Sequence, residues 1–255
     1  NFKEQISVAM GVDFKGWDFS FLTKTGRLSE APFAWNYNTI VQSYIKSSKK
    51  LLDMGTGGGE VLASLSPLPR DTYATESYLP NIDTAKRKLN PLGIDLIYVP
   101  ENSQPPYNDR LPFDNEFFDV VINRHEAYCP KELKRILKSQ GVFITQQVGF
   151  LTCANLTKDL LGSKAGYGNW NLQSAVDEVK DCGFRVVMQN EQITSERFYD
   201  IGAVVYYLKA VPWLIEDFTP EKYEKQLSNI YEIINQNGYY DTLLHRFIIV
   251  ALNEK

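Results

Sequence analysis

The sequence is poor in cysteine, and this scarcity narrows the kinds of site that the chain can build. Three cysteines, Cys129, Cys153 and Cys182, are spread over 255 residues without a Cys-x-x-Cys pair. Such isolated thiols exclude a zinc ribbon and argue against a framework of disulfides. We therefore expect small buried thiols in a reducing compartment, which favours the cytoplasm, and we expect no metal site.

Long hydrophobic runs and an excess of positive charge are also absent. No stretch of about 18 apolar residues occurs, so we expect no membrane span. The first residues, Asn1 to Gln5, lack the apolar stretch of a signal peptide. Lys and Arg number 27 against 31 Asp and Glu, which gives a formal net charge of -4. This balance argues against a general binder of nucleic acids.

Short apolar runs alternate with helical patterns between residues 36 and 150. Helices are expected at 36–45, 60–65, 82–89 and 131–138, between strands at 49–54, 72–75, 94–99, 117–122 and 142–145. This alternation predicts an α/β fold with a mostly parallel sheet and helices on both of its faces. The right-handedness of such crossovers makes the sheet doubly wound.

The pattern changes after residue 150. Helices are expected at 172–181 and 221–235, and strands at 184–188 and 246–252. The stretch 199–213 fits either a strand or a helix, and we favour a helix. The last strands would pair in antiparallel fashion at one edge of a seven-stranded sheet.

A glycine cluster follows the first apolar run and precedes a helix. Glycines at such a turn let the main chain come close to a ligand, because no Cβ atom blocks the approach. Glu60 stands where a GxGxxG dinucleotide fingerprint needs its third glycine, and no Gly-Lys-Ser/Thr phosphate loop is present. Asp53, just before the loop, would repel a pyrophosphate. A cationic or zwitterionic ligand is therefore favoured over NAD or ATP.

Glu76 ends the second predicted strand, about 20 residues after the glycine loop. A carboxylate at this place can accept two hydrogen bonds from ribose hydroxyls, as in nucleoside-binding α/β folds. Tyr78 and Leu79 follow and could stack on or cover a purine.

Four segments together resemble the class I S-adenosylmethionine-dependent methyltransferases. They are, in chain order, the acidic glycine loop 53–59, Glu76, the run 111–122 and the run 137–144. The resemblance covers about residues 35–150 and looks closest to the ubiquinone-biosynthesis-like, methyltransferase type 11 group. One departure is Gln140, where the usual pattern before the fifth strand has a glycine.

The resemblance implies a Rossmann-like methyltransferase domain that spans residues 1–255. Within it, residues 35–150 would form the cofactor-binding core, 1–30 an N-terminal cap and 151–240 substrate-covering insertions, before the last strand at 246–252. The implied cofactor is S-adenosyl-L-methionine, with S-adenosyl-L-homocysteine as product. The implied partner is a small-molecule methyl acceptor.

The resemblance also implies roles for individual residues. The main chain at Gly55 and Gly57, in a loop completed by Gly59, would approach the methionine part of the cofactor. Asp53 would help to hold the methionine amino end, and Glu76 would bind the ribose hydroxyls. The adenine amino group would meet the end of the third strand, at Glu101 or Asn102, with Asn108 and Asp109 as competitors for this role.

Residues after the fourth predicted strand are the candidates for chemistry. Asn123 and Arg124 would border the methionine and substrate side, where Arg124 either clamps a carboxylate or forms a surface ion pair. His125 is the candidate general base, with a purely structural role in the turn as the alternative. Gln146 and Gln147 end the fifth strand and could contact substrate. For His245 we expect a structural role.

Two other functions compete with small-molecule methylation. An RNA base could be the acceptor, although the ribosomal guanine methylases of related sequence carry an N-terminal zinc ribbon that this chain cannot build. A cofactor-binding protein without catalysis is the other alternative, because His125 is the one clear base. The segment Gln104–Tyr107 resembles the Pro-Pro-Tyr motif of amine methylases, but it precedes the fourth strand instead of following it.

Overall fold

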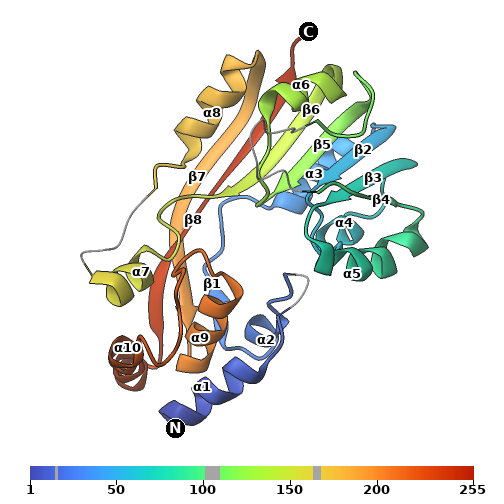
Figure 1. Ribbon diagram of the computed structural model, residues 1–255. Helices are drawn as coiled ribbons and strands as arrows, with labels where there is room; N and C mark the ends of the chain where they lie inside the picture. The colour runs from blue at the N-terminus through green and yellow to red at the C-terminus, as the bar shows by residue number, and fades with distance from the viewer. Residues whose placement is uncertain (15–16, 101–109, 163–167) are drawn as a thin grey trace. The chain divides into compact units, whose positions relative to one another are not determined.

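A computed structural model describes residues 1–14, 17–100, 110–162 and 168–255 (Figure 1). The chain divides into two compact units, each assembled from three segments. We call residues 34–149, 170–192 and 246–255 the sheet unit, and residues 1–33, 150–169 and 193–245 the helical unit. Within the described residues, no helix is both long and apolar enough to cross a membrane.

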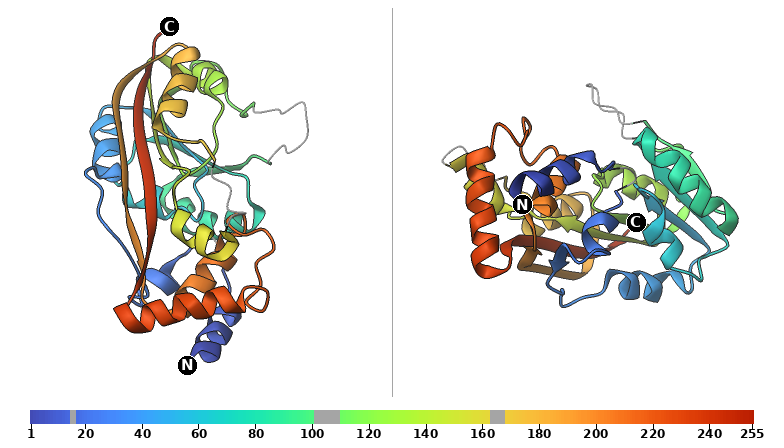
Figure 2. Two further views of the ribbon diagram at one scale, coloured as in Figure 1. Left: turned by 90° about the vertical axis from the view of Figure 1, so that its left-hand side faces the viewer. Right: turned by 90° about the horizontal axis from the view of Figure 1, so that it is seen from below.

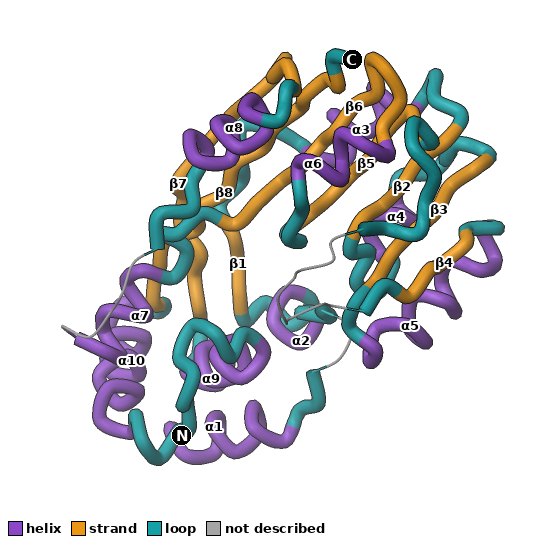
Figure 3. The backbone as a smooth tube through the Cα atoms, turned by 45° about the horizontal axis from the view of Figure 1, so that its top comes forward, coloured by secondary structure: helices purple, strands orange, loops and turns teal. Residues whose placement is uncertain are grey.

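The described strands form one sheet in the order β1-β7-β8-β6-β5-β2-β3-β4. Figure 3 shows them in orange. Their bounds are β1 Leu28–Glu30, β2 Lys50–Met54, β3 Asp71–Glu76, β4 Asp95–Tyr98, β5 Phe118–Arg124, β6 Leu137–Val148, β7 Phe184–Phe198 and β8 Tyr240–Asn253. β2 pairs in parallel with β3 and β5, as do β3 with β4 and β5 with β6. β8 is antiparallel to β6, and β1 is antiparallel to β7.

In the sheet unit, neighbouring strand residues enter different hydrophobic clusters. Leu51 and Val120 pack with one cluster and Leu52 and Val121 with the other, as the alternation of side chains along a strand requires. The first cluster holds residues of α3 (Tyr37–Ile45), α4 (Glu60–Ser64) and α5 (Leu79–Leu89); the second holds residues of α6 (Pro130–Ile136) and α8 (Leu172–Asp181). A short 3-10 helix, η1 (Asn90–Leu92), follows α5. Strands that are apolar toward both faces therefore specify the predicted doubly wound layers.

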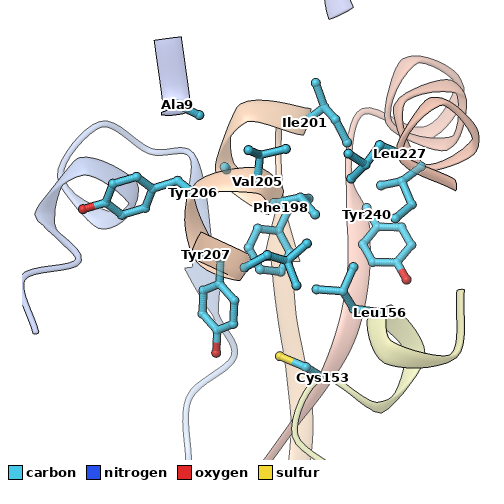
Figure 4. Close-up of a cluster of buried hydrophobic side chains, with 14 of the residues drawn as sticks. Ala9, Cys153, Leu156, Phe198, Ile201, Val205, Tyr206, Tyr207, Leu227 and Tyr240 are labelled. Carbon is cyan, nitrogen blue, oxygen red and sulfur yellow. The ribbon is translucent and has the colours of Figure 1, made fainter. Parts of the chain in front are cut away.

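The helical unit has a hydrophobic core of its own, which Figure 4 shows in close-up. Its helices are α1 (Phe2–Gly11), α2 (Ser20–Thr23), α7 (Ala154–Leu161), α9 (Ile201–Ala210) and α10 (Glu224–Asn237). Nine of the ten residues of α9 are buried, so this helix is apolar all round. Phe198 and Leu227 lie in the same cluster as α9.

The predicted α/β class with a mostly parallel sheet is confirmed, and the structure adds detail that the pattern did not contain. The stretch 199–213 holds a helix, α9, as favoured. The described sheet has an eighth strand, β1. β7 continues ten residues beyond the predicted strand, and β8 begins six residues before it (Figure 2). The antiparallel strand β8 lies between β6 and β7 instead of at an edge.

Candidate active site at the carboxyl ends of the parallel strands

The glycine loop leaves β2 with a backbone that glycine accommodates best. Gly55, Gly57 and Gly59 have φ values of 72°, 61° and 82°, in the left-handed region where a Cβ atom is unfavourable. Gly59 caps the N-terminus of α4, and a Cβ at this position would lie 2.9 Å from the side chain of Leu89 in α5. The loop therefore places backbone N–H groups at the carboxyl end of β2.

Glu76, the last residue of β3, turns its carboxylate toward this loop. Gly57 donates its backbone N–H to Oε2 across 2.6 Å, and Tyr78 donates to Oε1 across 2.8 Å. Ser77 donates to Oε1 as well, across 3.1 Å. The side chain is only 5% exposed, so these three donors offset the cost of burying the charge.

Asp53 lies beside the loop and is a second buried carboxylate, 4% exposed. The pKa of Asp53 is raised to about 6, chiefly by burial and less by the negative charge of Glu76, whereas Thr56 and Arg124 act to lower it. Tyr37 from α3 lies close enough that its own pKa is raised well above 10, chiefly by burial and then by the charge of Asp53. The carboxylates of Asp53 and Glu76 thus share a site that favours a positively charged ligand.

Asn123 near the end of β5 is fully buried, and only one of the two polar atoms of its side-chain amide has hydrogen-bond partners. Its Oδ1 accepts hydrogen bonds from Oγ1 of Thr145 (2.9 Å) and Nε2 of Gln147 (2.7 Å). Among the described residues, no group partners its Nδ2, although that atom is buried. Asn123 pairs with Met54, the residue before Gly55, so an unused donor lies next to the loop.

Arg124 is the last residue of β5, and His125 follows it in the turn. The guanidinium of Arg124 lies 5.9 Å from the centre of the Tyr37 ring. His125 has a φ of 62°, and its backbone N–H donates to the carbonyl of Gln146 across 2.8 Å. The surrounding protein lowers the pKa of His125 well below its usual range, and the charges of Arg246 and Arg124 lower it further. The imidazole is therefore neutral at physiological pH, although the residue as a whole is exposed to solvent.

Glu126 lies against the glycine loop, which the sequence did not reveal. A Cβ added to Gly55 would lie 2.7 Å from the Cβ of Glu126 and 2.8 Å from its carboxyl carbon. Gln147 fixes the main chain here by donating from Nε2 to the carbonyl of Glu126 across 2.9 Å. Gly55 is thus needed for the close packing of two loops as well as for its own conformation.

The structure brings most of the predicted residues to one edge of the sheet unit. Asp53, the loop glycines, Glu76, Asn123 and Arg124 all lie at the carboxyl ends of β2, β3 and β5 or directly after them. Three exposed side chains lie there too: Tyr78 (56% exposed), Leu79 (64%) and Tyr98 (43%). The predicted residues Glu101 and Asn102, their competitors Asn108 and Asp109, and the segment 104–107 fall outside the described residues.

His245 belongs to the helical unit and is buried there. Its Nδ1 accepts a hydrogen bond from the backbone N–H of Leu151 across 3.3 Å, and its ring packs on Phe150. Sequence reasoning missed Tyr37 and Glu126 as members of the site. For Tyr37 a signal existed, because it shares the spacing i, i+4, i+8 with the buried residues Val41 and Ile45.

Comparisons with known proteins match the part of the chain that forms the candidate site. Residues 52–145 match the family model described as a methyltransferase domain. A protein-L-isoaspartate O-methyltransferase from Dictyoglomus thermophilum is 26% identical over 117 residues, which cover 42% of this chain and 51% of that protein. The chain spans about half the length of the curated relatives it matches.

Solved structures share the fold at low sequence identity. The YcgJ protein from Bacillus subtilis has a TM-score of 0.56 and 15% identity, with coverage of 86% of this chain and 98% of that one. The cyclase SpnF has a TM-score of 0.52 and 12% identity, with coverage of 85% and 80%. These two likenesses concern the fold alone. Family model and relatives agree in supporting a methyltransferase domain of the class I S-adenosylmethionine-dependent superfamily over residues 52–145, and the sheet has the fold of these solved structures.

Proposed function

We propose that this protein transfers a methyl group from S-adenosyl-L-methionine to a small-molecule acceptor. The observation that carries the proposal is the meeting of Gly57 and Glu76, which joins the glycine loop to a buried carboxylate. This pair combines main chain free of Cβ atoms with an acceptor for hydroxyl groups. Asp53 adds negative charge on the same side.

The residues present fit this cofactor in three respects. The two buried carboxylates suit a ligand that carries a sulfonium and an ammonium group. The unpartnered Nδ2 of Asn123 would gain an acceptor, such as the carboxylate of the methionine part. The exposed rings of Tyr78 and Tyr98 lie next to Glu76 and could cover an adenine.

In the proposed mechanism the chain itself mainly binds and orients. Glu76 would hold the ribose, and Asp53 would hold the amino end. When bound, the cofactor would supply an electrophilic methyl group on a positively charged sulfur that leaves readily. Alignment of donor and acceptor for in-line displacement can supply up to about 7–11 kcal/mol of the barrier. A general base is needed only if the acceptor must lose a proton.

A small-molecule acceptor is supported by the charge of the chain and by its aromatic content. The formal net charge of -4 gives little attraction to a polyanion such as RNA. We propose that residues 1–30 and 151–240 cover the acceptor, since the helical unit exposes Trp17 and Trp213, whose rings lie 5.5 Å apart. The compartment that we propose is the cytoplasm.

Two measurements test this function. Isothermal titration calorimetry with S-adenosyl-L-homocysteine should detect binding that Asp53→Ala and Glu76→Ala abolish. Because a cyclase shares the fold, binding alone is not sufficient. Radiolabelled methyl transfer to a metabolite extract, compared with transfer to total RNA, should label small molecules. Failure of S-adenosyl-L-homocysteine to bind would refute the proposal. Labelling of RNA instead of small molecules would show that the acceptor is an RNA.

A further inference from the structure

A short chain of side-chain hydrogen bonds ends on the imidazole of His125. The indole Nε1 of Trp35 donates to Oε1 of Gln146 across 2.9 Å. Nε2 of Gln146 lies 3.2 Å from Nε2 of His125. Gln146 is only 5% exposed, so its amide is held in place by protein on nearly all sides. All three residues belong to the sheet unit.

This chain fixes the position of the proton on the imidazole. An indole N–H can only donate, so the amide atom that faces Trp35 must be the oxygen. The amide nitrogen, which only donates, therefore faces His125. Nε2 of His125 must then accept, and in a neutral imidazole the proton lies on Nδ1. The lone pair that a general base would use is occupied by Gln146.

The other ring nitrogen is the one available to a ligand. Among the described residues, no protein group forms a hydrogen bond with Nδ1 of His125. Two guanidinium groups lie close enough to act on this ring, that of Arg246 and that of Arg124, which directly precedes His125 at the end of β5. The backbone of His125 is held at a φ of 62°, a conformation that is uncommon for residues with a side chain. Residues in such conformations cluster at active sites and ligand clamps.

We infer that His125 binds the acceptor as a hydrogen-bond donor through Nδ1–H, and that the acceptor group is a carboxylate. Trp35 and Gln146 are positioning residues that set this tautomer. The inference rests on the proposed function, because it names the acceptor class for the same site. It replaces the general base expected at His125 with a group that recognises negative charge.

A carboxylate needs no base, which agrees with an occupied Nε2. A lone pair of the carboxylate oxygen forms the new bond to the methyl carbon. The bond between this carbon and sulfur breaks, and its electron pair stays on sulfur. The products are a methyl ester and S-adenosyl-L-homocysteine, and no proton moves. His125 keeps its proton throughout.

The tautomer can be measured without any turnover. The sequence has two histidines, so long-range proton–nitrogen NMR spectra of protein labelled with ¹⁵N-histidine contain two ring patterns, and His125→Gln assigns them. We expect His125 to be neutral with its proton on Nδ1 at pH 7. Trp35→Phe, which removes the indole N–H, should produce a mixture of tautomers. Trp170→Phe is the control, because Trp170 packs against the other hydrophobic cluster of the sheet unit, and it should leave the tautomer of His125 unchanged. An Nε2-protonated or doubly protonated ring in the unmodified protein overturns the inference.

The acceptor class is tested by titration of the complex with S-adenosyl-L-homocysteine. Benzoate should shift the Nδ1 resonance of His125, and benzamide, which has the same shape without the charge, should not. His125→Gln should weaken benzoate binding about tenfold or more, because a hydrogen bond to a charged group is lost. An unchanged resonance with saturating benzoate, or an equal response to benzamide, overturns the carboxylate assignment. Loss of S-adenosyl-L-homocysteine binding itself would count against the proposed function instead, and the tautomer result would stand.

Discussion

Gly57 and Glu76 are joined by a hydrogen bond of 2.6 Å from the backbone N–H of the glycine to the carboxylate. This bond connects the loop after β2 to the end of β3, and it orients the carboxylate along the carboxyl edge of the sheet. Because Ser77 and Tyr78 hold the other oxygen, the side chain has little freedom to rotate. The carboxylate that we propose as the ribose ligand is therefore already held in one orientation.

Substitution of Glu76 by glutamine tests how much the charge of this side chain contributes to ligand binding, because the two side chains have nearly the same shape. We expect Glu76→Gln to weaken binding of S-adenosyl-L-homocysteine about 10- to 100-fold, because hydrogen bonds to a charged group contribute about 1.5–3 kcal/mol. Glu254→Gln is the matched control, since Glu254 is exposed and pairs with Arg185 outside this network. Isothermal titration calorimetry measures both. Equal affinities for the two variants would show that Glu76 does not contact the ligand.

Substitution of Gly55 tests the packing of Glu126 on the loop. Gly55→Ala places a methyl group at a φ of 72° and within 3 Å of Glu126, so we expect a loss of more than 2 kcal/mol in the free energy of unfolding. Gly26→Ala has a similar φ of 70°, with open space around the added carbon. It should cost only the conformational strain, about 1–2 kcal/mol. Urea unfolding of the two variants measures the difference.

A second substitution identifies the cause. In a Glu126→Gly background, Gly55→Ala should cost about as much as Gly26→Ala, because only the strain remains. Binding of S-adenosyl-L-homocysteine by Gly55→Ala would have to be measured below its unfolding temperature. If the cost of Gly55→Ala were the same with and without Glu126, the two side chains would not be in contact.

The pKa of Asp53, raised from 3.8 to about 6 by burial, predicts how stability depends on pH. The folded protein then holds this proton more tightly than the unfolded chain. The free energy of unfolding must therefore fall as the pH rises from about 4 to about 6, and remain lower above that range. A shift of this size corresponds to about 3 kcal/mol at pH 7.5.

Asp53→Asn removes this cost along with the charge. We expect the variant to be about 1–3 kcal/mol more stable than the unmodified protein at pH 7.5 and to have no advantage at pH 4. Urea unfolding at several pH values gives the difference between the two proteins, in which other titrating groups cancel. The same variant should bind S-adenosyl-L-homocysteine more weakly at pH 7.5. A pH-independent difference in stability would contradict the raised pKa.

Most of the fold could be predicted because its strands are apolar toward both faces of the sheet. Runs such as 49–54 and 117–122 stand out against polar helices, and the crossover rule then fixes the layers. The far part of β7 could not be predicted, since residues 189–196 contain a single apolar residue, Ile193, and therefore show no apolar alternation. β1 has only three residues, and its pairing with Phe198, Arg197 and Glu196 depends on a strand distant in sequence.

The candidate site divides in the same way. The loop and Glu76 could be predicted, because special backbone conformations need glycine and a strand end needs no long-range information. The chain from Trp35 through Gln146 to His125 could not, because it joins residues 111 positions apart. The position of Glu126 over Gly55 depends on the pairing of β2 with β5 and on the turn that follows β5.

Gln140 replaces the glycine that the resemblance leads one to expect, and the structure shows what this replacement costs. Its φ is 61°, so a residue with a Cβ atom occupies the left-handed region within β6, where the pairing with β5 shifts register. Gln140→Gly should relieve about 1–2 kcal/mol of strain, less the greater freedom of glycine in the unfolded chain. We expect a net stabilisation of about 0.5–1 kcal/mol in urea unfolding. Gln42→Gly, in the right-handed helix α3, should instead destabilise by about 1 kcal/mol. Destabilisation by both substitutions would mean that the Gln140 side chain contributes contacts that outweigh its strain.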